Sequence, residues 1–258
     1  MAINEPYIPK EFLALQINYC KQQLAELPEV RIGKRKRNGS FSEVYLVGLH
    51  CHQKNCDKGK ELRSIYNKRE ALICELSRLE GLWHSKFTCL PPEDIAPRKV
   101  ERRLFINPAN SVILNGAFFD SLKNDADPNH RESKTFFYNG TYYRSASEVE
   151  IARYYTENGI PFKYEPEIWL NGLNYPIYTD FVILIKALDL CKFHEHIGMK
   201  NAANYNRTTA TKYINYSGAG LLPELDIFYT YDIPGVPFDL RTLPIKLNGV
   251  IHSSLFLP

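Results

Sequence analysis

The sequence predicts an α/β protein with a mixed β-sheet core flanked by helices, preceded by a helix–hairpin–helix region. In residues 136–258, short apolar runs and segments of helical spacing alternate in the order helix–β–β–β–helix–β. In residues 1–90, two amphipathic patterns enclose a turn signal. Residues 91–135 are rich in Pro, Asn and Asp, which is typical of an irregular connection. We therefore expect three segments, 1–90, 91–135 and 136–258.

The first segment contains two predicted helices and a hairpin. Residues 10–28 carry apolar residues at helical spacing, and Pro28 ends the pattern. Asn38–Gly39 lies between a basic run and an alternating run, which indicates a hairpin. Residues 60–86 form a long amphipathic pattern with a heptad-like stripe. That stripe offers a surface for a homodimer, with packing inside the chain as the alternative.

Positive charge is concentrated in the first part of the chain. Residues 1–103 carry 19 Lys and Arg against 13 Asp and Glu, whereas residues 104–258 carry 13 against 16. Four consecutive basic residues, Lys34, Arg35, Lys36 and Arg37, precede the hairpin turn. Such a run is suited to phosphate contacts, so we expect these residues to bind nucleic acid. A solvated turn is the alternative.

The last segment begins with a hairpin signal at Asn139–Gly140 and a helix over residues 145–159. Ser145 stands three residues before Glu148, the spacing of a capping box, and Gly159 is suited to end the helix. Strands are expected over 160–170, 174–185, 192–198 and 225–231, with a helix over 201–220.

Two acids stand at neighbouring strand ends. If the strands over 174–185 and 192–198 pair through a turn centred between Ala187 and Leu188, Asp180 faces Glu195. Opposed like charges destabilise a strand pair unless a cation lies between them, and carboxylate oxygens suit Mg²⁺ or Mn²⁺. The alternative is a strand-entry Asp180 and a solvated Glu195 at a sheet edge.

The ordered motifs "SASEVEIA", "YE", "DF" and "EHIG" over residues 140–232 resemble the PD-(D/E)XK nuclease superfamily, and more narrowly bacterial endonuclease-like proteins with S-E, Y-E, (P)D-F and E-H-x-G motifs. The resemblance implies a restriction-endonuclease-like core. It implies metal binding by Asp180, Glu195 and the backbone carbonyl of His196, and a catalytic acid at Glu148. Glu165 matches the acid of the "YE" step, for which both a structural and a catalytic role remain open.

The chain departs from that pattern at two positions. Thr179 replaces the proline before Asp180, and Ile197 replaces the lysine expected two residues after Glu195. Lys212, on the following helix, is the candidate to supply the catalytic ammonium group. Lys192 lies three positions before Glu195, so on a regular strand it points to the opposite face.

These observations predict a metal-dependent endonuclease that hydrolyses phosphodiester bonds, most simply in DNA, with Mg²⁺ or Mn²⁺ and no organic cofactor. A nuclease fold that only binds DNA or a protein is the alternative, and an RNA-directed or small-molecule hydrolase is a third. The chain contains no apolar run of about eighteen residues and no signal-peptide pattern, so we expect no membrane span and a cytoplasmic location.

Overall fold

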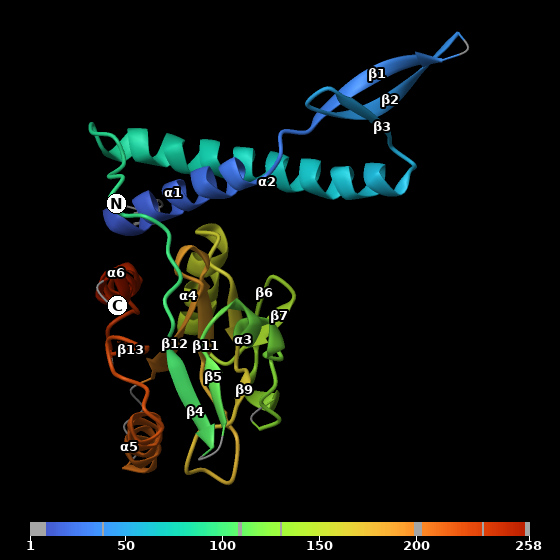
Figure 1. Cartoon of the computed structure of the whole chain (residues 1–258). Coiled ribbons are helices and arrows are strands. Elements are labelled where there is room, and N and C mark those ends of the chain that lie inside the picture. Colours follow the sequence, from blue (N-terminus) through green and yellow to red (C-terminus); the bar gives the residue numbers. More distant parts are fainter. Residues whose placement is uncertain are drawn as a thin grey trace. The chain divides into compact units, whose positions relative to one another are not determined.

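The protein is of mixed α/β class, with six α-helices and several small sheets in the part of the chain that the computed structural model describes (Figure 1). That part comprises residues 9–37, 39–107, 110–129, 131–198, 203–233 and 235–255. The chain divides into two compact units, one of Leu13–Pro97 and the other of Met1–Phe12 with Arg98–Pro258. None of the helices in the described ranges has the length and apolar character needed to span a membrane.

The Leu13–Pro97 unit contains helices and a small antiparallel sheet. Its elements are α1 (Lys10–Glu26), which begins in the other unit, β1 (Arg31–Arg37), β2 (Ser40–Val47), β3 (His50–Gln53) and α2 (Asp57–Lys86). The strands pair in the order β1-β2-β3, so the hairpin carries a third strand that the sequence did not indicate. Val30, Tyr45 and Leu62 form a small core that joins the sheet to α2. Asn38, in the predicted turn, lies outside the described residues.

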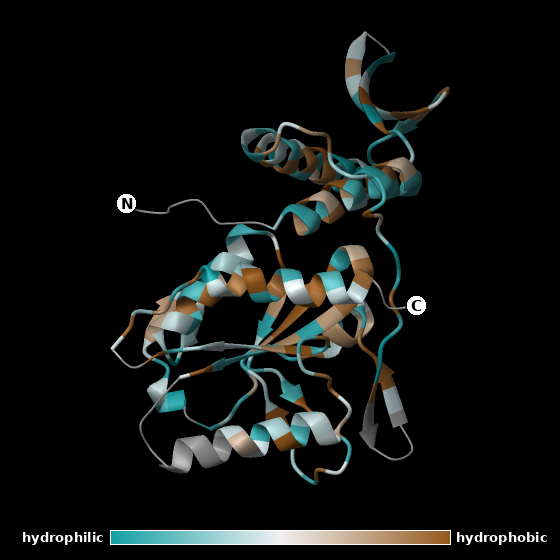
Figure 2. Ribbon diagram, turned by 90° about the vertical axis from the view of Figure 1, so that its left-hand side faces the viewer, coloured by the Kyte–Doolittle hydropathy of each residue, from teal (hydrophilic) through white to brown (hydrophobic). Residues whose placement is uncertain are grey.

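A four-stranded mixed sheet is the centre of the other unit. Its order is β13 (Ile227–Tyr231), β12 (Leu190–Ile197), β11 (Phe181–Ile185) and β8 (Phe162–Tyr164). The β12–β13 pair is parallel and the other two pairs are antiparallel. The strands are largely hydrophobic, and β11 and β12 are buried almost throughout (Figure 2). Burial on both faces explains the continuous apolar run of β11, whereas β12 also buries Lys192, His194, Glu195 and His196.

The register between β11 and β12 is the one that the sequence predicted. Phe181 pairs with His194 and Ile183 with Lys192, so the next positions along the two strands are Asp180 and Glu195. A short 3₁₀ turn over Lys186–Leu188 joins the strands. The two acids are therefore neighbours because the turn fixes the register.

Helices α4 (Ala146–Glu157) and α5 (Ala203–Gly218) contact adjacent residues of β12, whose side chains point in opposite directions. The hydroxyl of Tyr155 on α4 lies 2.8 Å from Nδ1 of His194, and the hydroxyl of Tyr216 on α5 donates to Glu195. Because successive side chains of a strand point to opposite faces, the two helices cover opposite faces of the sheet. Glu195 consequently points toward α5.

Two expected strands are each broken into two. Residues 160–170 form β8 and β9 (Glu167–Ile168), and residues 174–185 form β10 (Ile177–Tyr178) and β11. Glu165 has a φ of 41°, a left-handed conformation that ends β8. β9 and β10 then pair in a separate two-stranded ladder.

The segment expected to be irregular contains secondary structure, which corrects that expectation. It holds β4 (Arg103–Asn107), β5 (Asn110–Ile113) and α3 (Gly116–Ser121). The N–H of Cys191 on β12 donates to the carbonyl of Leu114, which ties this segment to the sheet. Leu104, Leu114 and Phe119 are buried. Their burial is the reason that the polar-rich segment folds onto the sheet.

The remaining elements are a hairpin and a C-terminal helix. β6 (Phe136–Tyr138) and β7 (Thr141–Tyr143) form the hairpin expected at Asn139–Gly140. Helix α6 (Thr242–Leu255) was not predicted from the sequence, since Pro244 and Gly249 interrupt its helical pattern. Proline is tolerated in the first turn of a helix. Leu243, Leu247 and Val250 bury one apolar face of α6.

Candidate functional site

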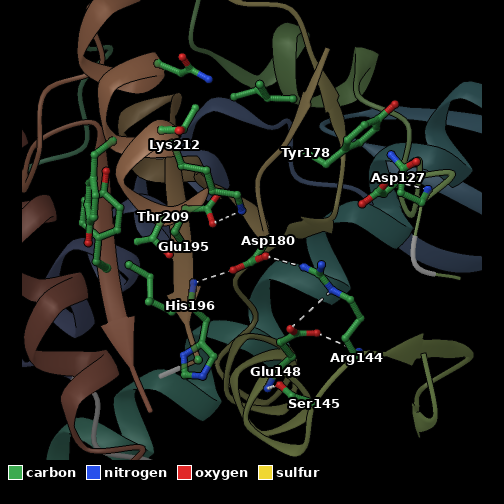
Figure 3. Close-up of a pocket in the computed structure, with 18 of the residues that line it drawn as sticks. Asp127, Arg144, Ser145, Glu148, Tyr178, Asp180, Glu195, His196, Thr209 and Lys212 are labelled. Carbon is green, nitrogen blue, oxygen red and sulfur yellow. Dashed lines mark hydrogen bonds and ion pairs between the residues drawn. The ribbon is translucent and has the colours of Figure 1, made fainter. Parts of the chain in front are cut away.

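A pocket of about 770 Å³ opens beside the ends of β11 and β12. It is lined by Glu148 of α4, by Asp180 just before β11, by Glu195 and His196 of β12, and by Lys212 of α5 (Figure 3). The fold thus brings together five residues that the sequence singled out. They come from positions spread over the segment from residue 148 to residue 212.

Asp180 is almost fully buried, and both of its carboxylate oxygens accept hydrogen bonds. The backbone N–H of His196 donates to Oδ2 at 2.7 Å, and Nη2 of Arg144 donates to Oδ1 at 2.9 Å. The contact with His196 fixes the carboxylate against β12. It involves the N–H of His196, whereas the resemblance assigns the carbonyl of this residue to a metal.

Glu195 lies between two donors from α5. The ammonium of Lys212 is 2.7 Å from Oε2, and the hydroxyl of Tyr216 donates to Oε1. Burial, and then the charge of Asp180, raise the pKa of Glu195 to about 7, against the opposing effect of Lys212. Burial alone would lower the pKa of Lys212, but Glu195 and Asp180 together raise it, so this lysine stays protonated.

Glu148 sits in the first turn of α4, where the helix cap orients it. The hydroxyl of Ser145 accepts from the N–H of Glu148 at 3.1 Å, as the capping pattern predicts. The carboxylate then accepts from the N–H of Arg144 at 3.0 Å and from the hydroxyl of Tyr164 at 2.7 Å. Burial, and then the charge of Asp180, raise the pKa of Glu148 to about 7.

Arg144 is a member of the site that sequence reasoning missed. Its guanidinium lies 2.7 Å from Glu165, 2.9 Å from Asp180 and 3.9 Å from Glu148. A cation just before a helix N-terminus is unfavourable for the helix dipole, so such a residue indicates an acidic partner nearby. The motif "YRSAS" contains this signal.

Glu165 forms an ion pair with Arg144 but does not line the pocket. Its side chain is fully buried and also forms an ion pair with Lys134. Its backbone N–H donates to the carbonyl of Asp180 at 3.0 Å. The carboxylate of Glu165 thus pairs with Lys134 and Arg144 in the interior, which favours the structural interpretation of the "YE" motif.

The oxygen donors of this pocket fit a hard divalent cation. Asp180 and Glu195 are buried like charges that act on each other, and the charge of Asp180 raises the pKa of both acids beside it. Within the described residues, no three His, Cys, Asp or Glu side chains converge on one point. Mg²⁺ is commonly held by one or two carboxylates with water in the other positions, so Asp180 and Glu195 are the residues of this pocket that could hold it.

The two lysines considered with Glu195 in the sequence lie on opposite faces of β12. Lys212 reaches Glu195 across the face covered by α5, as the sequence allowed. Lys192 lies on the opposite face, where its ammonium donates to the carbonyl of Leu225 at 2.6 Å. Its pKa is lowered to about 8 by burial. Lys192 is therefore separate from the carboxylates of the pocket.

The basic run of the hairpin belongs to the Leu13–Pro97 unit. Lys34, Arg35 and Lys36 on β1 are exposed, and the ammonium of Lys36 lies 5.9 Å from the ring centroid of Phe41. The side chain of Arg37 lies outside the part of the chain that is described. Alternation along β1 places Lys34 and Lys36 on one face of the hairpin and Arg35 on the other.

Comparison with protein-family models, with curated proteins and with solved structures found no match for this chain.

Proposed function

We propose that this protein is a metal-dependent endonuclease with a restriction-endonuclease-like core, and that its substrate is DNA. The observation that carries the proposal is the position of Lys212 beside Glu195. The PD-(D/E)XK pattern, which the sequence resembles, requires an ammonium group near its second acid, and Ile197 lacks one. Lys212 supplies that group from α5, 2.7 Å from the carboxylate. This position supports Lys212 as the substitute for the lysine that the pattern places at position 197.

Mg²⁺ or Mn²⁺, held by Asp180, Glu195 and the carbonyl of His196, would polarise a phosphoryl oxygen and lower the pKa of water. Lys212 offers a fixed positive charge to the phosphate as negative charge develops on it. Glu148, with a pKa near neutral pH, can hold or release a proton beside Asp180.

The hairpin supports a polyanionic substrate. Its exposed residues Lys34, Arg35 and Lys36 come from both faces of a narrow β-ribbon. At these residues the sheet is two-stranded, because β3 pairs only with Val44–Val47 of β2. A two-stranded ribbon is narrow enough to enter the major groove of DNA, and lysine and arginine are the usual phosphate contacts. We propose that Arg37, the next residue of this basic run, also contacts the substrate.

Cleavage assays test this function directly. Supercoiled plasmid, single-stranded DNA and RNA are incubated with Mg²⁺ or Mn²⁺ and wild-type protein, Asp180→Asn or Lys212→Met. We expect cleavage of DNA by the wild type and a loss of at least about 100-fold in both variants. Asp226→Asn is the matched control, because Asp226 is equally buried but pairs with Arg102.

Three outcomes separate the alternatives. Cleavage of RNA alone would move the substrate class from DNA to RNA. Binding of DNA without cleavage, with either metal, would favour a nuclease fold that serves only as a binding module. Cleavage that survives in Asp180→Asn would overturn the proposed site.

A further inference from the structure

Arg144 forms an ion pair with Asp180, the carboxylate that the proposed function assigns to the metal. Its Nη2 lies 2.9 Å from Oδ1 of Asp180, while the N–H of His196 takes Oδ2 at 2.7 Å. Both oxygens of Asp180 therefore have protein donors. The N–H of His196 is neutral, but the guanidinium carries a full positive charge at hydrogen-bond distance from Oδ1.

A guanidinium in this position opposes a divalent cation at the same carboxylate. Arginine stays protonated in proteins, so Arg144 cannot yield by losing its proton. A cation bound to Asp180 would stand close to that guanidinium in a buried site, where repulsion between like charges is poorly screened. Metal binding and the Arg144–Asp180 ion pair are therefore in competition.

The surroundings of Arg144 allow the guanidinium to turn. Its Nε lies 2.7 Å from Oε1 of Glu165 in an ion pair, so the side chain keeps an electrostatic partner when Nη2 leaves Asp180. Glu165 is also paired with Lys134, which keeps the buried carboxylate compensated throughout. The Arg144 side chain lines the pocket and is 28% exposed, which leaves it a path toward a ligand (Figure 3).

We propose that Arg144 serves two anions in turn: the carboxylate of Asp180 in the metal-free protein, and a phosphate of the substrate once a divalent cation has taken Asp180. This inference rests on the proposed function. The fork of a guanidinium matches phosphate as well as carboxylate, so one side chain is suited to both partners. Arg144 then couples the arrival of the metal to the binding of the substrate.

The proposal predicts opposite changes in two affinities. In Arg144→Met, the competitor for Asp180 is gone, so Mn²⁺ binds roughly tenfold more tightly by calorimetry. In the same variant, the affinity for an oligonucleotide in the presence of Ca²⁺ falls roughly tenfold, because the phosphate contact is lost. Removal of an arginine that merely stayed on Asp180 would also relieve the repulsion of Mn²⁺, so the fall in oligonucleotide affinity is the change that a structural arginine would not produce.

Arg102→Met is the matched control. Arg102 also pairs with a buried aspartate, Asp226, at 2.6 Å, outside the pocket lining. We expect this variant to lower the melting temperature and to leave Mn²⁺ affinity unchanged. Arg144→Lys keeps the positive charge but loses the two-pronged donor geometry of the guanidinium. It serves as a second variant if Arg144→Met does not fold. We expect Mn²⁺ affinity between those of wild type and Arg144→Met, with weakened oligonucleotide binding.

Mn²⁺ affinity that is unchanged or weaker in folded Arg144 variants would overturn the proposal. Because this measurement needs no cleavage, it is separate from the test of the nuclease function. If the wild type cleaves DNA but Arg144→Met shows no gain in Mn²⁺ affinity, only the role of Arg144 is contradicted. If the wild type does not cleave DNA but Arg144→Met gains Mn²⁺ affinity, only the nuclease function is contradicted.

Discussion

The ammonium of Lys212 lies 2.7 Å from Oε2 of Glu195, although seventeen residues separate them along the chain. Glu195 is on a strand and Lys212 is on the helix that covers its face. In the resembling nuclease pattern, the lysine stands two residues after the acid on the same strand. Here that position is Ile197, and the charge comes from the neighbouring helix instead.

Relocation of the lysine is testable by returning it to the strand. We expect Lys212→Met to reduce DNA cleavage by about 100- to 1,000-fold, because the positive charge beside the phosphate is lost. Ile197→Lys in the Lys212→Met background restores a lysine on the same face of β12 as Glu195, and we expect partial recovery. Single-turnover cleavage rates measure both effects.

The control for this pair is Lys246→Met, which removes an ammonium that lies 2.9 Å from exposed Glu224. We expect it to leave the rate unchanged. A cleavage rate that is unchanged in Lys212→Met would contradict the relocation.

The positions of Asp180 and Glu195 were predictable because a strand pair has only one register for a given turn. The helix cap at Ser145 was predictable because its signal is local. Arg144 was not predicted, since its partners Glu165 and Asp180 meet only when β8 ends in a left-handed residue. Helix α6 was missed because its stability comes from apolar contacts with the rest of the unit rather than from helix propensity.

The metal-free protein should lose stability as the pH rises through neutrality. The pKa values of Glu148 and Glu195 are raised to about 7 from an ordinary 4.5, chiefly by burial. The folded protein therefore holds these protons more tightly than the unfolded chain. Their contribution to stability is complete below about pH 4.5 and is lost as the pH passes through 7.

Thermal unfolding between pH 5 and pH 8, at ionic strength kept constant, measures this loss. We expect Glu148→Gln and Glu195→Gln each to flatten the curve, because the amide does not titrate. We also expect Mn²⁺ to raise the melting temperature more at pH 8 than at pH 5, since the carboxylates must be ionised to bind it. A pH dependence that is the same in the wild type and in both Gln variants would contradict the raised pKa values.

Tyr216 provides a further test of the pKa of Glu195. Its hydroxyl donates to the carboxylate from α5 and so favours the ionised acid. Tyr216→Phe removes that donor, and we expect the pKa of Glu195 to rise. The pH–rate profile of DNA cleavage should then shift to higher pH by about one unit. Tyr213→Phe, on the same helix, is the control, since the Tyr213 hydroxyl lies near that of Tyr231.

Lys192 predicts a second, alkaline effect of pH on stability. Its pKa is lowered to about 8 from an ordinary 10.5, chiefly by burial. Between these values the unfolded chain binds more protons than the folded protein, so the free energy of unfolding contributed by this group rises with pH. Urea unfolding at pH 8 and pH 10 measures the change. We expect Lys192→Met to remove it, whereas a Lys246→Met control should retain it.

The hairpin predicts how binding responds to salt. Each phosphate contact contributes about 0.9 to the slope of log affinity against log salt concentration on duplex DNA. Replacing Lys34, Arg35 and Lys36 by alanine should therefore weaken binding to all duplex sequences alike and lower that slope by about 3. The control replaces Lys58, Lys60 and Lys68 on α2, three exposed lysines of the same unit. Fluorescence anisotropy at several salt concentrations gives both slopes. An equal fall of the slope in the two triple variants would show that binding depends on the overall positive charge and not on contacts of the hairpin.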